Sequence, residues 1–516
     1  MTLTPFVNTA LTDFSNTKNI DAMEAALSRV SGQLGRVYPL WLGGERVTTP
    51  DTRDSIDPAD PKTVVGKASN ATPEHVNRAF EAATAVFPTW RRTGPEVRAR
   101  VLLRTASLMR QRRLDFAAWM VFEVSKSWVE ADADVAEAID FLEFYAREMI
   151  RLGAPQPVVE NPGEEGELRY IALGTCVVIP PWNFPLAITA GMTAAALVAG
   201  NPVILKPAST APVIAAKLVE LFHEAGLPSG VLSFITGSGA KIGDLLVKDP
   251  RTRLVAFTGS KEVGLGISKH CGEVAPGQRW IKRAVLEMGG KDAIVVDDDC
   301  DIEAAIQGAV AAAFGFQGQK CLACSRLIVH EKVYDRVVEG VVKLTEKLTV
   351  GHPRDRANTV GAMIDKNAFE KTLKYIEHGR GEGRVVAGGG KGPDGGFFIR
   401  PTVVADCDMK SKLMQEEIFG PVLAVGKARS WAHALEWAND SEYGLTGAVY
   451  SRSRDHLEEA RHEFHCGNLY LNRKCTGALV GVHPFGGFDM SGTDSKAGGR
   501  DYLLLFTQAK VVTEKL

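Results

Sequence analysis

The sequence predicts an α/β fold with two doubly wound, parallel-type sheets, one of them Rossmann-like, and a small additional β flap. Two observations support this class. Short β-branched segments alternate with helical segments twice along the chain, as in proteins whose helices cover both faces of a parallel sheet. The 516 residues also exceed what one hydrophobic core usually covers, so we expect two domains with substantial cores.

Helices are expected in the first third of the chain. Apolar residues recur with helical spacing before residue 36, which predicts an N-terminal helical arm. Thr72 is a predicted N-cap with Pro73 in the first helical turn. Two longer helices are then expected over Pro95–Lys126 and Val129–Leu152.

Two series of buried strands follow, each separated by helices. The predicted strands of the first sheet are Cys176–Ile179, Pro202–Leu205, Leu232–Ile235 and Leu254–Phe257. Those of the second sheet are Ala293–Val296, Arg326–Val329, Thr402–Val404 and Ala448–Tyr450. The tail from Asp501 to Leu516 resembles an edge strand, and an exposed edge invites pairing with a second chain. We therefore expect a homodimer or a higher oligomer built from dimers.

The charge balance bears on the class of partner. With 60 basic and 62 acidic residues, nothing indicates a nucleic acid or an anionic membrane as partner, and a small molecule is favoured. The longest apolar region, residues 177–205, is interrupted by prolines and asparagines, which fits buried strands better than a membrane span. The N-terminal residues show neither a secretory nor a transit pattern, so a cytoplasmic location is expected.

A cysteine in a Gly- and Gln-rich turn is the first candidate for chemistry. The stretch FGFQGQKCLACSR contains Cys321, and backbone N–H groups at such a turn could favour a thiolate nucleophile; a small buried residue is the alternative. Cys321 and Cys324 also form a CxxC pair, the pattern of a redox or zinc protein. Zinc would need a second ligand pair, and His330 is the only close candidate, so we expect no metal.

Other polar groups follow predicted strands. The sequence Phe257-Thr258-Gly259-Ser260 ends a strand before a predicted helix, where N–H groups and the helix dipole can hold a pyrophosphate. No GxGxxG follows the first strand, so a dinucleotide would bind in a variant way. Lys206 could reach ribose hydroxyls, or it could be an ordinary turn lysine. Two prolines flank Asn183 in PWNFP and would hold its amide rigid, as suits an oxyanion donor.

Two carboxylates are further candidates. Glu287 stands at a strand end before two glycines, where a general base could approach a thioester. Glu137 lies among apolar neighbours of a predicted helix, so it could face a cavity, or it could belong to a solvated helix face.

Seven motifs follow one another across most of the chain: PWNFP, KPAS, FTGS, LEMGGK, FGFQGQKC, EEIFGPV and HPFGGF. In this order they resemble the aldehyde dehydrogenase superfamily. The resemblance implies that Cys321 attacks an aldehyde, that the Asn183 amide and the Cys321 N–H stabilise the oxyanion, and that Glu287 activates water for hydrolysis of a thioester. It implies NAD as cofactor, with NADP possible. The implied cofactor-binding residues are Ile179, Pro180, Trp182, Lys206, Ser209, Gly239, Gly243, Phe257, Thr258, Gly259, Ser260, Glu417 and Phe419.

Within the superfamily, the chain is most similar to the dehydrogenases that oxidise L-glutamate γ-semialdehyde, formed from 1-pyrroline-5-carboxylate, to L-glutamate in proline catabolism. The motifs AEAIDF, LNRKCTGALVG and HPFGGFDMSGTDSKAGG carry this similarity. It implies backbone N–H donors for the substrate carboxylate, a carboxylate for its α-ammonium group and aromatic walls along its aliphatic chain. The implied substrate-binding residues are Glu137, Phe184, Gly477, Ala478 and Phe485.

Two positions depart from that family. Leu322 stands where the family has a serine that contacts the substrate carboxylate, so another semialdehyde or an aliphatic aldehyde is the alternative substrate. Ser209 stands where many NAD-preferring relatives have a glutamate, which leaves NADP open. A non-catalytic binding or structural homologue is the alternative from another class, although the nucleophile, base and amide are all present.

The resemblance also implies a division of the chain. We expect an N-terminal helical arm over residues 1–36, an NAD(P)-binding domain over 37–156 and 175–288, a catalytic domain over 289–488, and oligomerisation strands over 157–174 and 489–516.

Overall fold

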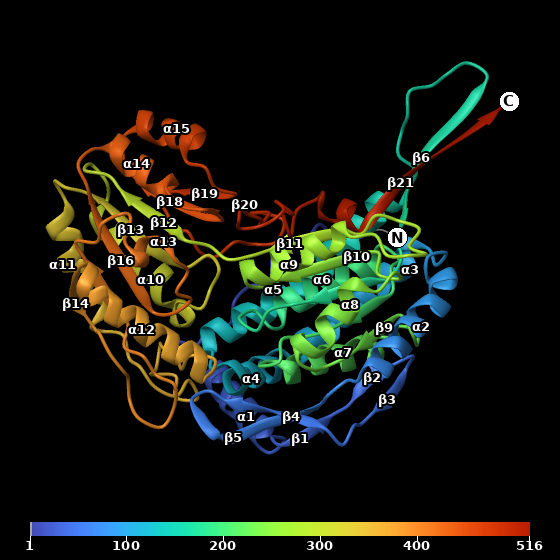
Figure 1. Ribbon diagram of the computed structural model, residues 1–516, viewed down its shortest axis with the longest axis horizontal. Coiled ribbons are helices and arrows are strands. Elements are labelled where there is room, and N and C mark those ends of the chain that lie inside the picture. Colours follow the sequence, from blue (N-terminus) through green and yellow to red (C-terminus); the bar gives the residue numbers. More distant parts are fainter. Residues whose placement is uncertain (1–2) are drawn as a thin grey trace.

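The structure is a computed structural model that describes residues 3–516, and two seven-stranded sheets form its frame (Figure 1). The first sheet contains, in spatial order, β11 (Arg283–Glu287), β10 (Leu254–Thr258), β7 (Cys176–Ile179), β8 (Val203–Leu205), β9 (Leu232–Phe234), β2 (Leu40–Leu42) and β3 (Glu45–Val47). The first five run parallel, while β2 pairs antiparallel with β9 and with β3.

Both faces of the first sheet are covered. Cys176 and Val178 of β7 enter one core, and Val177 enters another, because successive side chains of a strand point to opposite faces. Buried on both sides, these strands read as continuous apolar runs, which is why the sequence identified them. The helices of this half are α2 (Pro73–Trp90), α3 (Pro95–Gln111), α4 (Arg113–Val124), α5 (Trp128–Gly153), α6 (Ala187–Val198), α7 (Pro212–Glu224), α8 (Asp244–Lys248) and α9 (Lys261–Gly272).

The second sheet has the same construction. It contains, in spatial order, β14 (Arg384–Ala387), β15 (Thr402–Ala405), β16 (Val422–Ala428), β13 (Cys324–His330), β12 (Asp292–Val296), β18 (Thr446–Tyr450) and β19 (Asn468–Leu471), all parallel except β14. Its helices are α10 (Ile302–Phe314), α11 (Tyr334–Thr345), α12 (Lys366–Glu382), α13 (Lys412–Gln415), α14 (Trp431–Asn439) and α15 (Arg454–Glu463). The predicted class of two doubly wound sheets is confirmed.

A two-stranded ribbon projects from the body of the molecule (Figure 1). It pairs β6 (Glu164–Ala172) antiparallel with β21 (Thr507–Lys515). The predicted edge strand thus begins only at Thr507. Residues 502–506 instead form a 3₁₀ turn, Tyr502–Phe506, because three of its apolar side chains are buried in the core of the first sheet.

The structure corrects the sequence prediction in the first 130 residues. The predicted arm contains one helix, α1 (Thr17–Ser31), and residues 3–16 form neither helix nor strand. The predicted helix Pro95–Lys126 is two helices, α3 and α4, and α4 stops because Ser125 adopts the left-handed conformation (φ 56°).

Strands between residues 36 and 69 were not predicted. β1 (Arg36–Tyr38), β5 (Asp60–Ser69) and β4 (Thr52–Asp57) form a three-stranded sheet. Their apolar alternation is weak, and β5 contains a proline, which is unusual inside a strand. A short antiparallel pair, β17 (Tyr443–Gly444) and β20 (Phe488–Asp489), completes the strands. None of the helices between residues 3 and 516 is both long and apolar enough to cross a membrane.

Candidate active site

The carboxyl ends of the first sheet collect most of the predicted site residues at one edge. Asn183 follows β7, Lys206 follows β8, and β10 and β11 end at Thr258 and Glu287. Because these strands are parallel, their ends lie on the same side, where ligands of open α/β sheets bind. The register pairs Thr258 with Glu287, and the Gly259 N–H donates to the Glu287 carbonyl over 3.0 Å. The predicted pyrophosphate loop therefore adjoins the predicted base.

The turn before Cys321 has an unusual backbone. After α10, the chain makes a 3₁₀ turn, Gly315–Gly318, in which Phe316 (φ 49°) and Gln317 (φ 57°) are left-handed. For residues with a Cβ this conformation costs about 1–2 kcal/mol each. Gly318 is also left-handed, and a side chain there would collide with the Gly420 carbonyl. Such strain persists only where surrounding contacts fix the backbone, and it is typical of functional sites.

The two glutamines of the motif provide those contacts. Gln317 Nε2 donates to the carbonyls of Ser125 (3.1 Å) and Ala362 (2.9 Å). Gln319 Oε1 accepts from the Ile364 N–H over 2.9 Å. Both glutamines are buried. They tie the turn to the end of α4 and to residues 362–364, so Cys321 is held in a fixed position.

The Cys321 thiol lies in a protonating environment. Burial, and then the carboxylates of Asp292, Glu287 and Glu417, raise its pKa above the ordinary cysteine value, while the Leu322 backbone N–H opposes this. The thiolate is the nucleophilic form of cysteine, so the reaction has to remove the thiol proton. Cys324, the other half of the CxxC pair, starts β13, is buried, and donates to the Arg326 carbonyl over 3.5 Å.

The Asn183 amide is rigid and close to the turn. Asn183 is buried, and its Nδ2 donates to the Gln319 carbonyl over 3.1 Å. An amide nitrogen has two N–H donors, so one remains for an oxygen bound near Cys321. That the prolines of PWNFP hold this amide rigid for an oxyanion stays a prediction.

Glu287 is a buried carboxyl group with one free oxygen. Its Oε1 accepts a short hydrogen bond from Ser495 Oγ. Its Oε2 has no hydrogen-bond partner among residues 3–516. Burial raises the pKa of Glu287 to about 8, against the opposing effects of Ser495 and Lys496. A carboxyl group with such a pKa can both hold and accept a proton near neutral pH, as a general base must.

The predicted substrate residues come from three elements. Glu137 is half-buried on α5, and burial together with the Asp134 carboxylate raises its pKa to about 8. On the same helix, Asp134 pairs with the fully buried Lys126 over 2.6 Å. The Lys126 ammonium lies 4.2 Å from the ring centre of Phe184. Glu137 is thus only partly exposed, and its orientation toward a cavity stays a prediction.

The loop of Gly477 and Ala478 is shaped by an arginine. Arg473 Nη2 donates to the carbonyls of Thr476 (2.9 Å) and Gly477 (3.1 Å). Gly477 is left-handed (φ 83°), a conformation that glycine adopts readily because it has no Cβ. Phe485 forms a β-bridge with Ala497.

The predicted cofactor residues fall into two groups. Near the turn, the Trp182 ring packs edge-on against Phe419 (5.5 Å) and Phe316 (6.5 Å), and Glu417 accepts from the Gly290 N–H over 3.0 Å. The second group lies at or after the ends of β7, β8, β9 and β10. It comprises Ile179, Pro180, Lys206, Ser209, Gly239, Gly243, Phe257, Thr258, Gly259 and Ser260.

The second group fits a nucleotide. Lys206 is buried, its Nζ contacts only the Pro207 carbonyl (3.3 Å) within the described chain, and burial lowers its pKa to about 8. An amine buried without a carboxylate partner suits a hydroxyl ligand. A Cβ built on Gly239 or Gly243 would meet no atom within 4 Å, so the backbone there is open to a ligand. Ser209 Oγ donates to the Gly237 carbonyl over 3.3 Å.

Sequence reasoning missed the groups that support the site. Lys320, next to the nucleophile, pairs with Glu130 of α5 over 2.6 Å. Asn8 of the arm donates to Asp140 of α5 and to the Val480 carbonyl, both over 2.9 Å, and so joins α5 to the loop of residues 477–480. Ser495 was also missed. Each joins segments far apart in the sequence. Lys320 and Ser495 lie inside recognised motifs, FGFQGQKC and HPFGGFDMSGTDSKAGG, but neither motif indicates the distant partner.

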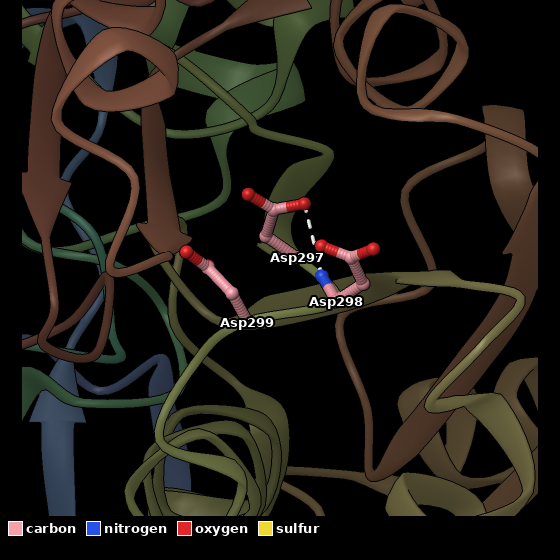
Figure 2. Close-up of side chains that lie close together, drawn as sticks. All are labelled: Asp297, Asp298 and Asp299. Carbon is pink, nitrogen blue, oxygen red and sulfur yellow. Dashed lines mark hydrogen bonds between the residues drawn. The ribbon is translucent and has the colours of Figure 1, made fainter.

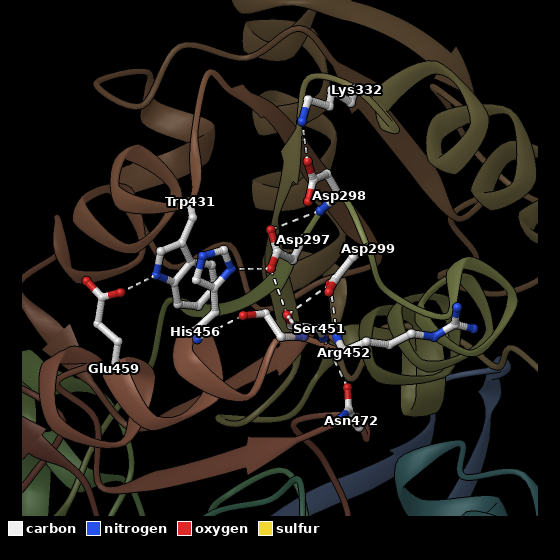
Figure 3. A network of polar contacts seen from close by, with 11 residues as sticks. Asp297, Asp298, Asp299, Lys332, Trp431, Ser451, Arg452, His456, Glu459 and Asn472 are labelled. Carbon is white, nitrogen blue, oxygen red and sulfur yellow. Dashed lines mark hydrogen bonds and ion pairs between the residues drawn. The ribbon is translucent and has the colours of Figure 1, made fainter.

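One acidic cluster lies outside this site. Asp297, Asp298 and Asp299 follow β12 at its carboxyl end, and their carboxylate oxygens lie within 4.8 Å of one another (Figure 2). Figure 3 shows that protein donors already surround them. The donors are Lys332 Nζ to Asp298, Ser451 Oγ to Asp297 and Asp299, the Arg452 N–H to Asp299, the Asp298 N–H to Asp297, and His456 Nδ1 to Asp297. The cluster is a structural network that joins α15 to the second sheet.

A thiol, a carboxyl group and a rigid amide at the junction of two α/β sheets are the groups that covalent catalysis at a carbonyl carbon requires. The model of the aldehyde dehydrogenase family matches residues 46–512. The chain belongs to this family.

Relatives that match over the full length of the chain carry the name of one particular dehydrogenase within this family. A 1-pyrroline-5-carboxylate dehydrogenase of Geobacillus kaustophilus (strain HTA426) is 57% identical over 510 residues, 99% of each chain, and one of Geobacillus thermodenitrificans (strain NG80-2) is 56% identical over the same share. A solved structure of 1-pyrroline-5-carboxylate dehydrogenase from Thermus with bound NAD is 50% identical, covers 100% of both chains and has a TM-score of 0.98.

Proposed function

We propose that this protein oxidises L-glutamate γ-semialdehyde, the open form of 1-pyrroline-5-carboxylate, to L-glutamate with NAD. Full-length relatives with this name support the substrate, and a similar structure with bound NAD supports the cofactor. The observation that carries the proposal is the placement of the Asn183 amide, by its bond to Gln319, beside the turn of Cys321, with Glu287 acting electrostatically on the same thiol.

The first half of the reaction uses the thiol and the amide. The Cys321 sulfur bonds to the aldehyde carbon as its proton passes to solvent, and the carbonyl oxygen becomes an oxyanion. The free N–H of Asn183 donates to this oxyanion, a contribution of about 3 kcal/mol for one such donor. The nicotinamide cofactor, when bound, supplies the acceptor for the hydride that leaves the same carbon.

The second half uses Glu287. The carboxylate takes a proton from water as the water oxygen bonds to the thioester carbon, and the carbon–sulfur bond then breaks. The Cys321 thiolate leaves and takes up the proton that Glu287 accepted, so the thiol and the carboxylate are both restored. Because the Glu287 pKa is about 8, this half is expected to accelerate as the pH rises through that value.

The cofactor is held by the two groups of residues at the strand ends. Lys206 and Glu417 supply a donor and an acceptor for ribose hydroxyls, and the N-terminus of α9 at Ser260 faces the phosphates. Trp182 and Phe419 border the nicotinamide. The hydroxyl of Ser209 does not repel a phosphate as a carboxylate would, so some activity with NADP is expected.

The carboxylate and the α-ammonium group, which share the α-carbon of the substrate, are held by different segments. The N–H groups of Gly477 and Ala478 receive the carboxylate, since the loop carbonyls are occupied by Arg473. Glu137 receives the α-ammonium group, and this positive charge favours the ionised form of Glu137 over the protonated form that burial favours. Phe184 and Phe485 flank the aliphatic carbons.

The ribbon of β6 and β21 is proposed as the contact with a second copy. Val511 and Val512 are 63% and 38% exposed, and an isolated two-stranded ribbon is only marginally stable in water. Pairing along its free edge would give a dimer, which sedimentation should detect.

The eight cysteines are free, which supports a reducing compartment such as the cytoplasm.

A panel of aldehydes tests the proposal. The purified protein is assayed with glutamate semialdehyde, with a semialdehyde that lacks the α-ammonium group and with an unsubstituted aliphatic aldehyde, each with NAD and with NADP. We expect the highest kcat/KM for glutamate semialdehyde with NAD. A higher value for the aliphatic aldehyde would contradict the substrate and leave the thiol chemistry standing.

A further inference from the structure

A segment outside both sheets runs beside β11 and carries a hydroxyl group to the base. Residue Gly492 forms an antiparallel bridge with Glu287. The Met288 N–H donates to the Ser491 carbonyl over 2.7 Å, and the Thr493 N–H donates to the Leu286 carbonyl over 2.9 Å. The segment of residues 491–497 is thus attached to β11 on both sides of Glu287.

The backbone of this segment turns sharply around Ser495. Asp494 (φ 49°) and Lys496 (φ 51°) are both left-handed, so Ser495 is flanked by two strained residues. The Lys496 ammonium donates to the carbonyls of Gly467 (2.8 Å) and Gly486 (2.7 Å), which fixes the end of the turn. Ser495 itself is 4% exposed. Its hydroxyl therefore has little freedom and points to one partner.

That partner is the predicted general base. Ser495 Oγ donates to Glu287 Oε1, and Oε2 is left without a partner among residues 3–516. One oxygen is thus fixed while the other is available to a ligand. The same segment pairs with Phe485 through Ala497, with hydrogen bonds of 2.8 and 2.6 Å, so it joins the base to a wall of the substrate site.

We propose that Ser495 is a positioning residue for the hydrolytic half of the reaction: its hydroxyl holds the Glu287 carboxylate so that the free oxygen can take the proton of the attacking water. This rests on the proposed function. Ser495 itself forms no bond to the substrate. Its effect is confined to the step in which water adds to the thioester carbon and the Cys321 thiolate leaves.

Charged groups on three elements face Glu287. Ser495 and Lys496 on the segment favour its ionised form, and Asp494 on the same segment opposes it. Cys321 on the catalytic turn and Tyr502 on the 3₁₀ turn of residues 502–506 both interact electrostatically with it. Removing the Ser495 hydroxyl takes away one stabiliser of the carboxylate, so the pH at which Glu287 ionises moves up.

The test compares Ser495→Ala, Ser495→Thr and the control Thr493→Val. Thr493 lies on the same segment, and its Oγ1 accepts from the Leu286 N–H over 3.0 Å without contacting the Glu287 carboxyl group. Each variant is assayed with glutamate semialdehyde and NAD by stopped-flow, which gives the rate of the first turnover and the steady-state rate from pH 6 to about 10. Thermal unfolding monitors the fold.

For Ser495→Ala we expect an unchanged first turnover and a steady-state rate at pH 7 about tenfold lower, with the rise of that rate displaced to higher pH. Ser495→Thr, which keeps the hydroxyl, should recover most of the rate. Thr493→Val should lower the unfolding temperature and leave the pH profile in place.

Two results would overturn the inference. One is a pH profile of Ser495→Ala that coincides with that of the wild type or of Thr493→Val. The other is an equal loss of first turnover and steady-state rate, which would indicate general disruption of the site. A wild-type protein that oxidises no aldehyde would instead contradict the proposed function, so the two failures are distinguishable.

Discussion

The carboxylates at the two ends of strand β12 differ in their hydrogen bonding. At its amino end, Asp292 has one oxygen, Oδ2, without a partner in the described chain, and burial raises its pKa to about 7. Glu287, just before the strand, likewise has a free oxygen. At the carboxyl end, Asp297 is equally buried but accepts from Asp298, Ser451 and His456. Burial is the same at both ends, and the number of donors differs.

This difference in hydrogen bonding separates the residues of the candidate active site from residues with a structural role. Buried polar groups in proteins are nearly always paired, so a buried carboxyl group without partners needs an explanation. Around Cys321 the free oxygens coincide with left-handed residues and raised pKa values, a combination typical of catalytic sites. At Asp297 both carboxylate oxygens accept hydrogen bonds from protein donors. Acidic residues alone therefore do not identify a functional site here.

The largest effect is expected from the thiol itself. Cys321→Ala removes the atom that bonds to the substrate, so aldehyde oxidation should fall below detection, while NAD binding, measured by tryptophan fluorescence, should persist. Cys324→Ala is the matched control from the same motif. Its thiol is buried against Arg326, so this variant should keep its activity and lose only some stability. Activity in Cys321→Ala close to wild type would contradict the mechanism.

Removal of the base should separate the two halves of the reaction. Glu287→Gln keeps the shape of the side chain and loses its basicity, so the first turnover should remain and steady-state turnover should fall about 10²- to 10⁴-fold. The wild-type steady-state rate should rise with pH through about 8, where Glu287 loses its proton, and the variant should lack this rise. Stopped-flow measurement of reduced cofactor checks both. Simultaneous loss of both phases would assign Glu287 an earlier role.

At the other end of β12, substitution should act on stability. Asp297→Ala leaves Ser451 and His456 without their buried acceptor, so the free energy of unfolding should fall by about 2–3 kcal/mol. Asp298→Ala is the control, because its bond to Lys332 lies at the surface, where such pairs contribute about 0–1 kcal/mol. Denaturant unfolding measures both. If Asp297→Ala instead leaves stability unchanged and abolishes the first turnover, the structural role of Asp297 is wrong.

Local patterns in the sequence predicted most of the fold. The continuous apolar runs of β7, β10, β12 and β18 identified the parallel strands, because burial on both faces leaves no polar alternation. β4 and β5 went unrecognised, because their burial follows no regular alternation and their pairing depends on tertiary context. The break between α3 and α4 depends on the backbone conformation of Arg112. No proline or glycine at this position indicates a break in the sequence.

The site was predictable to the extent that its residues lie in motifs. Cys321, Asn183 and Glu287 each stand in a short sequence whose local geometry favours their proposed roles. Ser495, Glu130 and Asn8 act on residues more than one hundred positions away, so local patterns do not indicate their partners, even though Ser495 lies in the motif HPFGGFDMSGTDSKAGG. Whether a buried carboxyl group has free oxygens also depends on such distant partners, and the contrast along β12 therefore required the structure.

The smallest effect is expected where the substrate site lacks a donor. Leu322 follows the nucleophile and is half-buried, and its carbonyl accepts from the Cys475 thiol over 3.5 Å. Leu322→Ser keeps this backbone contact and adds a hydroxyl group to a region that we propose binds a carboxylate. A net hydrogen bond contributes about 1 kcal/mol, so the KM for glutamate semialdehyde should fall about fivefold.

Leu322→Ala is the matched control, since it removes the same apolar group without adding a donor. Steady-state kinetics with glutamate semialdehyde and with an unsubstituted aldehyde compare the three proteins. The hydroxyl group should favour only the substrate with a carboxylate, because an aliphatic aldehyde offers it no acceptor in that position. Equal KM values for Leu322→Ser and Leu322→Ala with glutamate semialdehyde would mean that the carboxylate lies elsewhere, and Gly477 and Ala478 would then lose their proposed role while the Cys321 chemistry stood.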